Sequence, residues 1–540
     1  MTKKTERLLL FIIILVFISL RIAFITQKNL WFDEIYSWHL TLGSFHDIII
    51  RTSLDIHPPL YYFMLKLWNF LFGDSVFSMR LLSAIFSSLS LLFIYPICKR
   101  VLNPINSLTV IFLFAINPLN IFYSQEARMS AMNLFLNAGS VYFLLKMLDK
   151  EQGWKLYFKQ QDIYFYVLFR TLALYTHYFS FFIFTAEVIL VLLAPRLRVV
   201  ARIKSSSQQS LPKRDSAKNR LAPPLQVERG MGGEVKLYLA NFAAILLLYL
   251  PWIPTLIEHL SRGQSWRYGQ ITHSSFKELL NFIKDFNFGL YYHYTNLNLV
   301  HYITIFLVFV NVLSFLSFLF TFRPAYRRVL LSFPRRRESV PSFSPAIPFL
   351  LVFVPIFLGI IISFKQRIEF YRYLSIIIPY VLIFIVYGIT RINRKYIVVP
   401  ILLILMLINI FGLTVQYSFD FKNDDYRPLI KQIESDYETG DRIYVEPHYM
   451  GWSIDYYKKQ WDLKLPNPAY IRYGWNEILD SIKVQKPERF WVVLDYSAVD
   501  TINYAGYING LKKEFREEEK NTYYLAPTKV ELYSFRKKEK

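Results

Sequence analysis

The stretch LLLFIIILVFISLRIAFI, residues 8–25, decides the fold class. A helix that crosses a bilayer needs about 20 mostly apolar residues, and this stretch supplies them. Lys3, Lys4 and Arg7 precede it, as in a secretory signal, but no small-residue cleavage site follows. We therefore predict an uncleaved first membrane span, with Arg21 extending toward the outer interface.

Similar apolar stretches recur along the 540 residues, of which 54% are hydrophobic. The 48 Phe and 39 Tyr residues fit a protein whose aromatic rings gather at bilayer interfaces. The pattern predicts an α-helical polytopic membrane protein with about eleven transmembrane helices. The predicted spans are 8–25, 77–97, 105–121, 132–148, 163–176, 177–193, 237–257, 299–322, 346–364, 373–389 and 396–413.

The span at 163–176 contains Arg170, a charge in an apolar segment. We expect Arg170 either to snorkel at the inner interface or to mark a misplaced helix end.

The net charge of +22 raises the possibility of nucleic-acid binding, but the distribution of Lys and Arg argues against it. Much of the basic charge lies in alternate connections between apolar stretches, which is how membrane orientation is encoded. The N-terminus is therefore predicted in the cytoplasm of a multi-pass protein of the cell (inner) membrane. An odd number of spans then places the C-terminal tail outside. Cys98 is the sole cysteine, so no intrachain disulfide and no cysteine-rich metal site can form.

Composition divides the chain into two expected domains. Residues 1–415 form the transmembrane domain, with polar inserts at 205–234 and 333–345 that we expect to be disordered on the cytoplasmic side. Residues 416–540 have the composition of a small extracytoplasmic α/β domain. In this domain we expect a helix at 426–437 and strands at 442–446, 490–496 and 530–535. It contains no P-loop and no dinucleotide fingerprint.

The first external loop, residues 26–76, carries the polar residues that suggest chemistry. It contains WFDEIYSWHL at 31–40, with Asp33 and Glu34, and LDIHPP at 54–59, with Asp55 and His57. Transfer of a sugar to a hydroxyl needs a carboxylate base near the acceptor. A departing phosphate needs cations or hydrogen-bond donors where its charge develops. Acids and a histidine among interfacial aromatic residues fit a lipid-phosphate donor.

Six motifs in consistent order resemble those of the GT-C superfamily of glycosyltransferases. They are WFDE (31–34), DIHPPLYY (55–62), GDSVFSMRLLSA (73–84), NPLNIFYSQEARMSA (117–131), ALYTHYF (173–179) and EFYRYLSIIIP (369–379). The branch is that of the protein O-mannosyltransferases and lipid A aminoarabinose transferases. The resemblance implies a polyprenyl-phosphate sugar as donor, no nucleotide site and inversion at the anomeric carbon.

The resemblance also implies roles for the first-loop residues. Asp33 matches the catalytic acid of the family, and Glu34 matches a supporting or acceptor-side acid. His57 matches a donor-phosphate position, which is Lys in the aminoarabinose transferases and His in the mannosyltransferases, so the donor sugar stays open. Asp55 either orients the loop or takes part in the chemistry.

Three residues near later spans match the family as well. Arg80 is expected to support the first loop, although a snorkelling arginine at a helix end would have the same sequence context. Glu126 and Arg128 are expected to line the active-site cavity, or else to pair with each other.

Three further residues come from the later motifs. His177 is a site candidate at the outer junction of two spans, although it could be a satisfied buried histidine. Arg372, next to Tyr373 at the start of a span, is expected to bind the lipid phosphate, because guanidinium groups hold phosphate oxygens well.

A divalent metal is left open. Asp33, Glu34, Asp55 and His57 could form an oxygen-and-imidazole site, but no fixed spacing demands one.

Other functional classes explain less of the sequence. A transporter or flippase predicts ionisable residues at mid-membrane and inverted repeats, whereas the acids and histidines of this chain concentrate at the outer face. A receptor leaves the first-loop motifs unexplained. A polymerase or ligase that uses a diphosphate-linked lipid donor remains the closer alternative. The acceptor is open among envelope lipids, glycans and proteins.

Overall fold

The computed structural model describes residues 1–149, 161–206, 224–262, 275–288, 297–322, 346–363, 370–392, 394–418, 425–469, 475–496, 504–525 and 528–538. The chain forms two compact units. The first unit contains residues 1–23, 49–61 and 81–417, and the second contains residues 24–48, 62–80 and 418–540.

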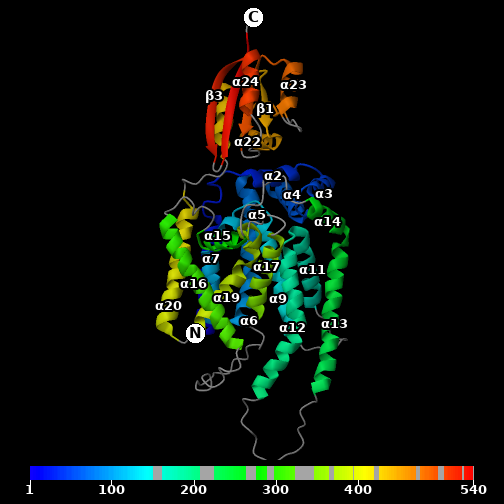
Figure 1. The fold of residues 1–540 in the computed structure, drawn as a ribbon, viewed down its shortest axis with the longest axis vertical. Coiled ribbons are helices and arrows are strands. Elements are labelled where there is room, and N and C mark those ends of the chain that lie inside the picture. Colours follow the sequence, from blue (N-terminus) through cyan, green and yellow to red (C-terminus); the bar gives the residue numbers. More distant parts are fainter. Residues whose placement is uncertain are drawn as a thin grey trace, which may run out of the picture. The chain divides into compact units, whose positions relative to one another are not determined.

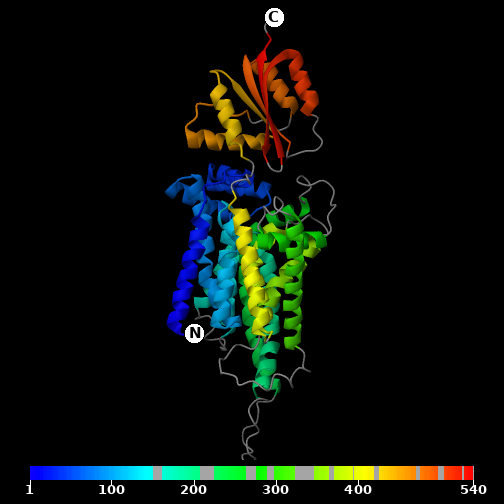
Figure 2. The same cartoon turned by 90° about the vertical axis from the view of Figure 1, so that its left-hand side faces the viewer.

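The first unit is a bundle of helices that share one apolar core (Figures 1 and 2). Among the close pairs, α9 packs on α11, α12 on α17, α16 on α19, and α1 and α19 on α7. The helices are α1 (Lys3–Ile22), α6 (Leu91–Val101), α7 (Pro104–Ala115), α8 (Pro118–Ser124), α9 (Ser130–Leu148), α11 (Gln161–Thr176), α12 (Ser180–Ser206), α13 (Pro224–Tyr249), η1 (Leu250–Trp252), α14 (Ile253–Arg262), α15 (Ser275–Phe288), α16 (Leu297–Phe322), α17 (Ala346–Ser363), α18 (Phe370–Tyr373), η5 (Leu374–Ile377), α19 (Ile378–Thr390) and α20 (Lys395–Gln416). Three helices, α3 (Phe45–Leu54), α4 (Leu60–Phe72) and α5 (Val76–Leu89), contribute residues to both units.

Several helices of the described chain have the length and apolar composition of membrane spans. Six qualify: Val76–Val101, Ser130–Leu148, Leu237–Ser261, Val300–Ser317, Ala346–Ser363 and Lys395–Gln416. α7 and α8 make a seventh if a bend of 59° is accepted within one span. The other four predicted positions are also helical, as α1, α11, Ser180–Ala194 and Leu374–Thr390. The protein is therefore a mostly helical, multi-pass membrane protein, and the total of eleven spans stays a prediction.

Arg21 does not reach the outer interface, so that expectation is wrong. Its side chain is fully buried and lies over the Phe17 ring, with the guanidinium carbon 3.3 Å from the ring centroid. It donates to the carbonyls of Ala115 (2.8 Å) and Phe114 (3.3 Å), where α7 ends. Pro118 has no N–H to pair with the Phe114 carbonyl. Arg21 therefore satisfies backbone groups that the bend between α7 and α8 leaves unpaired, which matters most where no water is present.

Arg170 neither snorkels nor marks a wrong helix end. α11 ends at Thr176 as predicted, and Arg170 is fully buried against Glu187 of α12. Its Nη2 and Nε donate to the two carboxylate oxygens at 2.6 and 2.9 Å, and its Nη1 donates to Asn137 at 2.6 Å. The sequence contained both charges in neighbouring predicted spans, and their pairing explains how each is tolerated.

The second unit combines part of the loop at residues 26–76 with the C-terminal residues. The loop supplies α2 (Phe32–Thr41), and the C-terminal residues supply α21 (Arg427–Asp436), β1 (Arg442–Glu446), η6 (His448–Met450), α22 (Gly451–Trp461), α23 (Trp475–Gln485), β2 (Arg489–Asp495), α24 (Tyr504–Glu514), β3 (Phe515–Leu525) and β4 (Thr528–Lys537).

The strands form a sheet in the order β1-β2-β4-β3, in which only β1 and β2 are parallel. Every residue of β2 is buried, in agreement with the helices seen on both sides of the sheet in Figure 2. The three expected strands are present as β1, β2 and β4. β3 was missed because its sequence, FREEEKNTYYL, is highly charged and lies at an edge of the sheet.

The structure describes only part of the two inserts that we expected to be disordered. Residues 207–223 and 333–345 lie outside the described part of the chain. Residues 224–234, however, are helical, as the first turns of α13, so disorder across the whole of 205–234 is wrong. Pro224 begins this helix, a position that suits its fixed φ, and the apolar span that follows continues the same helix.

Replacing Glu187 by Gln should lower the free energy of unfolding by about 3–5 kcal/mol, because the Arg170 charge stays buried without its carboxylate. A matched control is Lys99→Met, which breaks the more exposed pair with Glu6 and should cost about 1 kcal/mol or less. Thermal unfolding of the purified variants, followed by intrinsic fluorescence, compares them. Equal midpoints for Glu187→Gln and Lys99→Met would contradict this account.

Candidate functional site

Glu34 and Arg80 form a buried ion pair in the second unit. Arg80 Nε donates to Glu34 Oε1 at 2.8 Å and its Nη2 donates to Oε2 at 2.6 Å, a two-pronged geometry that strengthens the pair. The remaining donors of Arg80 reach three backbone carbonyls, each at 2.8 Å, of Ile25, Lys28 and Asn29. The pair therefore ties the start of α5 to α2 and to the segment that precedes α2. The alternative that Arg80 is a snorkelling arginine is excluded, because its side chain is buried.

Asp33 precedes Glu34 in the first turn of α2 and is 3% exposed. The N-terminus of a helix favours negative charge, because its backbone N–H groups point outward from the helix end. The Asp33 carbonyl accepts a hydrogen bond from the Ser37 hydroxyl at 2.9 Å. The neighbouring Phe32 ring contacts Tyr449 and stacks near Trp452, so aromatic side chains cover this end of α2.

Lys28 was not singled out from the sequence. Burial, with a smaller contribution from the nearby Arg80 charge, lowers the pKa of its ammonium group to about 7. Since the shift comes from three-dimensional burial, no pattern in the sequence indicated it.

Asp74 was also missed, although it lies within the GDSVF motif. Its Oδ2 accepts from Trp38 Nε1 at 2.6 Å and from Lys459 Nζ at 2.5 Å. Burial alone would raise the pKa of Asp74, but the hydrogen bonds from Lys459 and Trp38 outweigh it and hold the pKa below its usual value. The Tyr456 hydroxyl donates to the Asp74 backbone carbonyl at 3.2 Å. Asp74 thus joins α22 of the C-terminal residues to α2 of the first loop, and only the fold reveals this partner.

Asp55 and His57 form a second ionisable pair, in the first unit. His57 Nδ1 lies 3.1 Å from Asp55 Oδ2, so the carboxylate accepts the Nδ1–H and leaves Nε2 for another partner. The His57 and His177 rings lie edge to face, with centroids 5.8 Å apart. The Tyr373 ring is 5.6 Å from His177, and Phe179 stacks on Tyr373 at 4.5 Å.

His177 lies in the turn between α11 and α12, outside both helices. Burial lowers the pKa of its imidazole well below its usual value, and the charges of His57, Arg128 and Arg372 lower it further. His177 Nδ1 accepts the Phe179 backbone N–H at 3.1 Å. The low pKa favours the neutral form of His177.

Glu126 and Arg128 lie in the turn between α8 and α9, and each is 5% exposed. Seven predicted site residues belong to the first unit: Asp55, His57, Glu126, Arg128, His177, Arg372 and Tyr373. The other three belong to the second unit: Asp33, Glu34 and Arg80. Within the described residues, no group of three or more His, Cys, Asp or Glu side chains is arranged to hold a metal ion.

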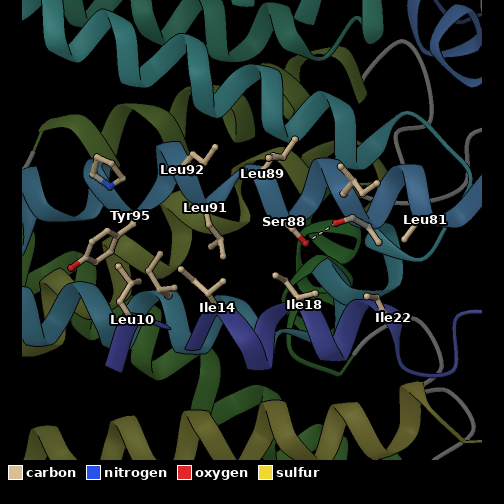
Figure 3. Close-up of a pocket in the computed structure, with 14 residues that line it drawn as sticks. Leu10, Ile14, Ile18, Ile22, Leu81, Ser88, Leu89, Leu91, Leu92 and Tyr95 are labelled. Carbon is tan, nitrogen blue, oxygen red and sulfur yellow. Dashed lines mark hydrogen bonds between the residues drawn. The ribbon is translucent and has the colours of Figure 1, made fainter. Parts of the chain in front are cut away.

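An apolar groove of about 470 Å³ runs along α1 in the first unit (Figure 3). Leu10 and Tyr95 lie at one end, and Ile22 and Leu81 lie at the other. The Ser88 hydroxyl, one of the few polar groups there, donates to the Ala84 carbonyl at 2.8 Å. The lining suits an aliphatic chain and offers nothing that would hold a sugar or phosphate.

Comparison with known proteins supports the resemblance found in the motifs. Residues 56–207 match the family described as Dolichyl-phosphate-mannose-protein mannosyltransferase. No curated protein sequence matches the chain significantly. The fold is similar to ArnT from Cupriavidus metallidurans in the apo state, with a TM-score of 0.53, 12% identity, and 99% and 98% of the two chains covered. The same ArnT bound to undecaprenyl phosphate gives a TM-score of 0.50, 12% identity and the same coverage. The chain therefore has the fold of these ArnT structures, which agrees with the resemblance found in the motifs.

Replacing Arg80 by Gln should destabilise the second unit by about 3–5 kcal/mol, because Glu34 stays buried without a cation and three carbonyls lose their donor. Arg536→Gln is a matched control, since Arg536 pairs with Glu438 and Glu518 in the same unit but is 40% exposed. Limited proteolysis with mass spectrometry should show faster cleavage within residues 24–48 for Arg80→Gln alone. Equal protection of this segment in both variants would contradict the role given to the pair.

Proposed function

We propose that this chain, which has the fold of the GT-C glycosyltransferases, transfers a sugar from a polyprenyl phosphate to a hydroxyl acceptor on the extracytoplasmic face. The acceptor oxygen attacks the anomeric carbon as the bond from that carbon to the phosphate oxygen breaks. The proton of the acceptor passes to a carboxylate base, and the polyprenyl phosphate leaves. A single displacement inverts the anomeric configuration.

The observation that carries the proposal is the gathering of basic groups in the first unit. His57 contacts His177, and the charges of Arg128 and Arg372 act on His177. The phosphodiester of a polyprenyl-phosphate sugar and the phosphate monoester that leaves both require such groups, because their negative charge must be compensated where water is scarce. We assign Arg372 and His57 to the donor phosphate, with Arg128, His177 and Tyr373 lining the same cavity. Asp55 orients His57 through Nδ1.

We assign the catalytic base to Asp33 and a positioning role to Glu34. Both oxygens of Glu34 are engaged by Arg80, so a change of Glu34 charge would disturb the loop. Burial favours the neutral form of a carboxyl group and so makes a buried carboxylate a stronger base, which suits the 3% exposed Asp33. Undecaprenyl phosphate, the lipid bound by the similar ArnT, is a suitable donor carrier, and the apolar groove along α1 could receive an aliphatic chain of this kind.

The alternative function is that of a transporter, which predicts ionisable residues within the spans. The Arg170–Glu187 pair is such a feature. The pair, however, is buried and hydrogen-bonded to other protein groups. Arg170 makes four hydrogen bonds, to Glu187, Asn137 and the Ser180 carbonyl, and neither residue is exposed. The contacts support a structural role and leave the glycosyltransferase as the better proposal.

The proposal includes a topology and a division into domains. Residues 1–415 form the transmembrane domain and residues 416–540 an extracytoplasmic domain. Residues 26–76 lie outside and residues 195–236 inside the cytoplasm. Ser44→Cys and Ser207→Cys, each in a Cys98→Ser background, should be labelled from opposite sides by a membrane-impermeant thiol reagent. Equal labelling in intact spheroplasts would refute this topology.

Replacing Asp33 by Asn should lower turnover by about 100-fold or more, the usual effect of losing a positioned base, while binding of undecaprenyl phosphate stays unchanged. Asp47→Asn is a matched control, because Asp47 is a nearby acid that binds Ser44 at the start of α3. Initial rates with a polyprenyl-phosphate sugar, together with unfolding midpoints, separate catalysis from stability. Normal turnover of a folded Asp33→Asn enzyme would remove Asp33 from the mechanism.

A further inference from the structure

A chain of hydrogen bonds connects three segments of the first unit: the end of α3, the turn between α11 and α12, and η1 with α14. It lies beside the proposed phosphate-binding residues His57, Arg128, His177 and Arg372, which we call the basic cluster. Trp252 Nε1 donates to the Tyr178 hydroxyl at 3.0 Å. The Tyr178 hydroxyl and His259 Nδ1 are 2.7 Å apart, and His259 Nε2 lies 2.9 Å from the Ser53 carbonyl oxygen. Trp252 and His259 are each 6% exposed, so these bonds are shielded from competing water.

The donors and acceptors of this chain fix the direction of its two end bonds. An indole N–H can only donate and a carbonyl can only accept. The His259 ring must therefore donate from Nε2 to the Ser53 carbonyl, while its Nδ1 is paired with the Tyr178 hydroxyl. Each nitrogen of the His259 ring thus has a separate partner. Each bond polarises the next one along the chain.

The two ends of the chain lie next to proposed donor-site residues. Ser53 is the last but one residue of α3, and carbonyls at a helix end have no partner within the helix. Asp55 and His57 follow it within four residues. Tyr178 adjoins His177 in the turn between α11 and α12. Asp55 also acts on Tyr178, since its charge adds to burial in raising the pKa of the phenol.

We infer that His259 of α14 and Tyr178 are positioning residues for the donor phosphate. They hold the His57 segment and the His177 turn at a fixed separation. The inference rests on the proposed function, because it takes the basic cluster as the phosphate site. Neither residue touches the phosphate. Several protein groups hold the phosphate at once. If the spacing between these groups becomes variable, the phosphate binds more weakly, because binding must then restore the fixed spacing.

Three substitutions separate positioning from packing. His259→Phe keeps a flat ring of similar size but removes both hydrogen bonds. His259→Gln keeps one N–H donor and one carbonyl acceptor. Tyr178→Phe removes the hydroxyl between Trp252 and His259. The matched control is Tyr175→Phe, which removes a nearby hydroxyl of α11 that donates to the Leu248 carbonyl at 3.1 Å.

The experiment is a titration of the purified full-length chain in nanodiscs with undecaprenyl phosphate, with Arg372→Ala as a benchmark for loss of a direct ligand. We expect about five- to tenfold weaker binding for His259→Phe and Tyr178→Phe, on the scale of one lost buried hydrogen bond. We expect near-normal binding for His259→Gln and Tyr175→Phe. Unfolding midpoints measured on the same samples show whether each variant is folded.

The outcomes distinguish the two hypotheses. If the wild type does not bind undecaprenyl phosphate, or Arg372→Ala binds like the wild type, the proposed donor site is wrong. If Arg372→Ala binds weakly while folded His259→Phe binds normally, the donor site stands and the positioning role is overturned. A loss in His259→Phe that His259→Gln does not restore also overturns it, because the ring itself and not its hydrogen bonds would then matter.

Discussion

Asp33 and Glu34, the candidate acids of α2, depend on one buried guanidinium group. Arg80 neutralises Glu34 and also donates to the carbonyls of Ile25, Lys28 and Asn29, which precede α2. These backbone groups are outside regular helix and need a donor, because unpaired polar groups are costly when buried. One side chain therefore fixes both the path of the chain into α2 and the position of Glu34, the acid beside Asp33. Lysine could not replace it, since a single ammonium group cannot serve a carboxylate and three carbonyls in a planar fork.

The same use of arginine recurs in the bundle. Arg21 supplies donors to carbonyls at the end of α7, where Pro118 interrupts the backbone pattern. Arg170 is balanced by Glu187 and two further acceptors. In a membrane protein such groups are tolerated when every donor is used, and each of them then restricts how neighbouring helices can pack.

The sequence predicted most of the helices, because the length of an apolar stretch is a local property. Helices occupy all the predicted spans, and three strands of the second unit are close to their predicted bounds. The missed features depend on partners far apart in the chain. The buried environments of Arg21 and Arg170 could not be predicted, because their acceptors come from other helices. β3 was missed because a charged edge strand lacks apolar alternation.

In the candidate site, the motifs identified individual residues, and the structure showed which of them form pairs. The pairs Glu34–Arg80 and Asp55–His57 join residues that the motifs had named. The motifs did not indicate Asp74, Lys28 or the Tyr178–His259 hydrogen bonds, since burial and hydrogen bonds between distant segments leave no local pattern in the sequence.

The direct test of the central claim is to supply membranes that contain the protein with labelled sugars on polyprenyl monophosphate or diphosphate. Both products are then analysed by mass spectrometry. The account predicts that only the monophosphate-linked sugar is transferred and that free polyprenyl phosphate appears in equal amount. Transfer from the diphosphate-linked donor alone would contradict it.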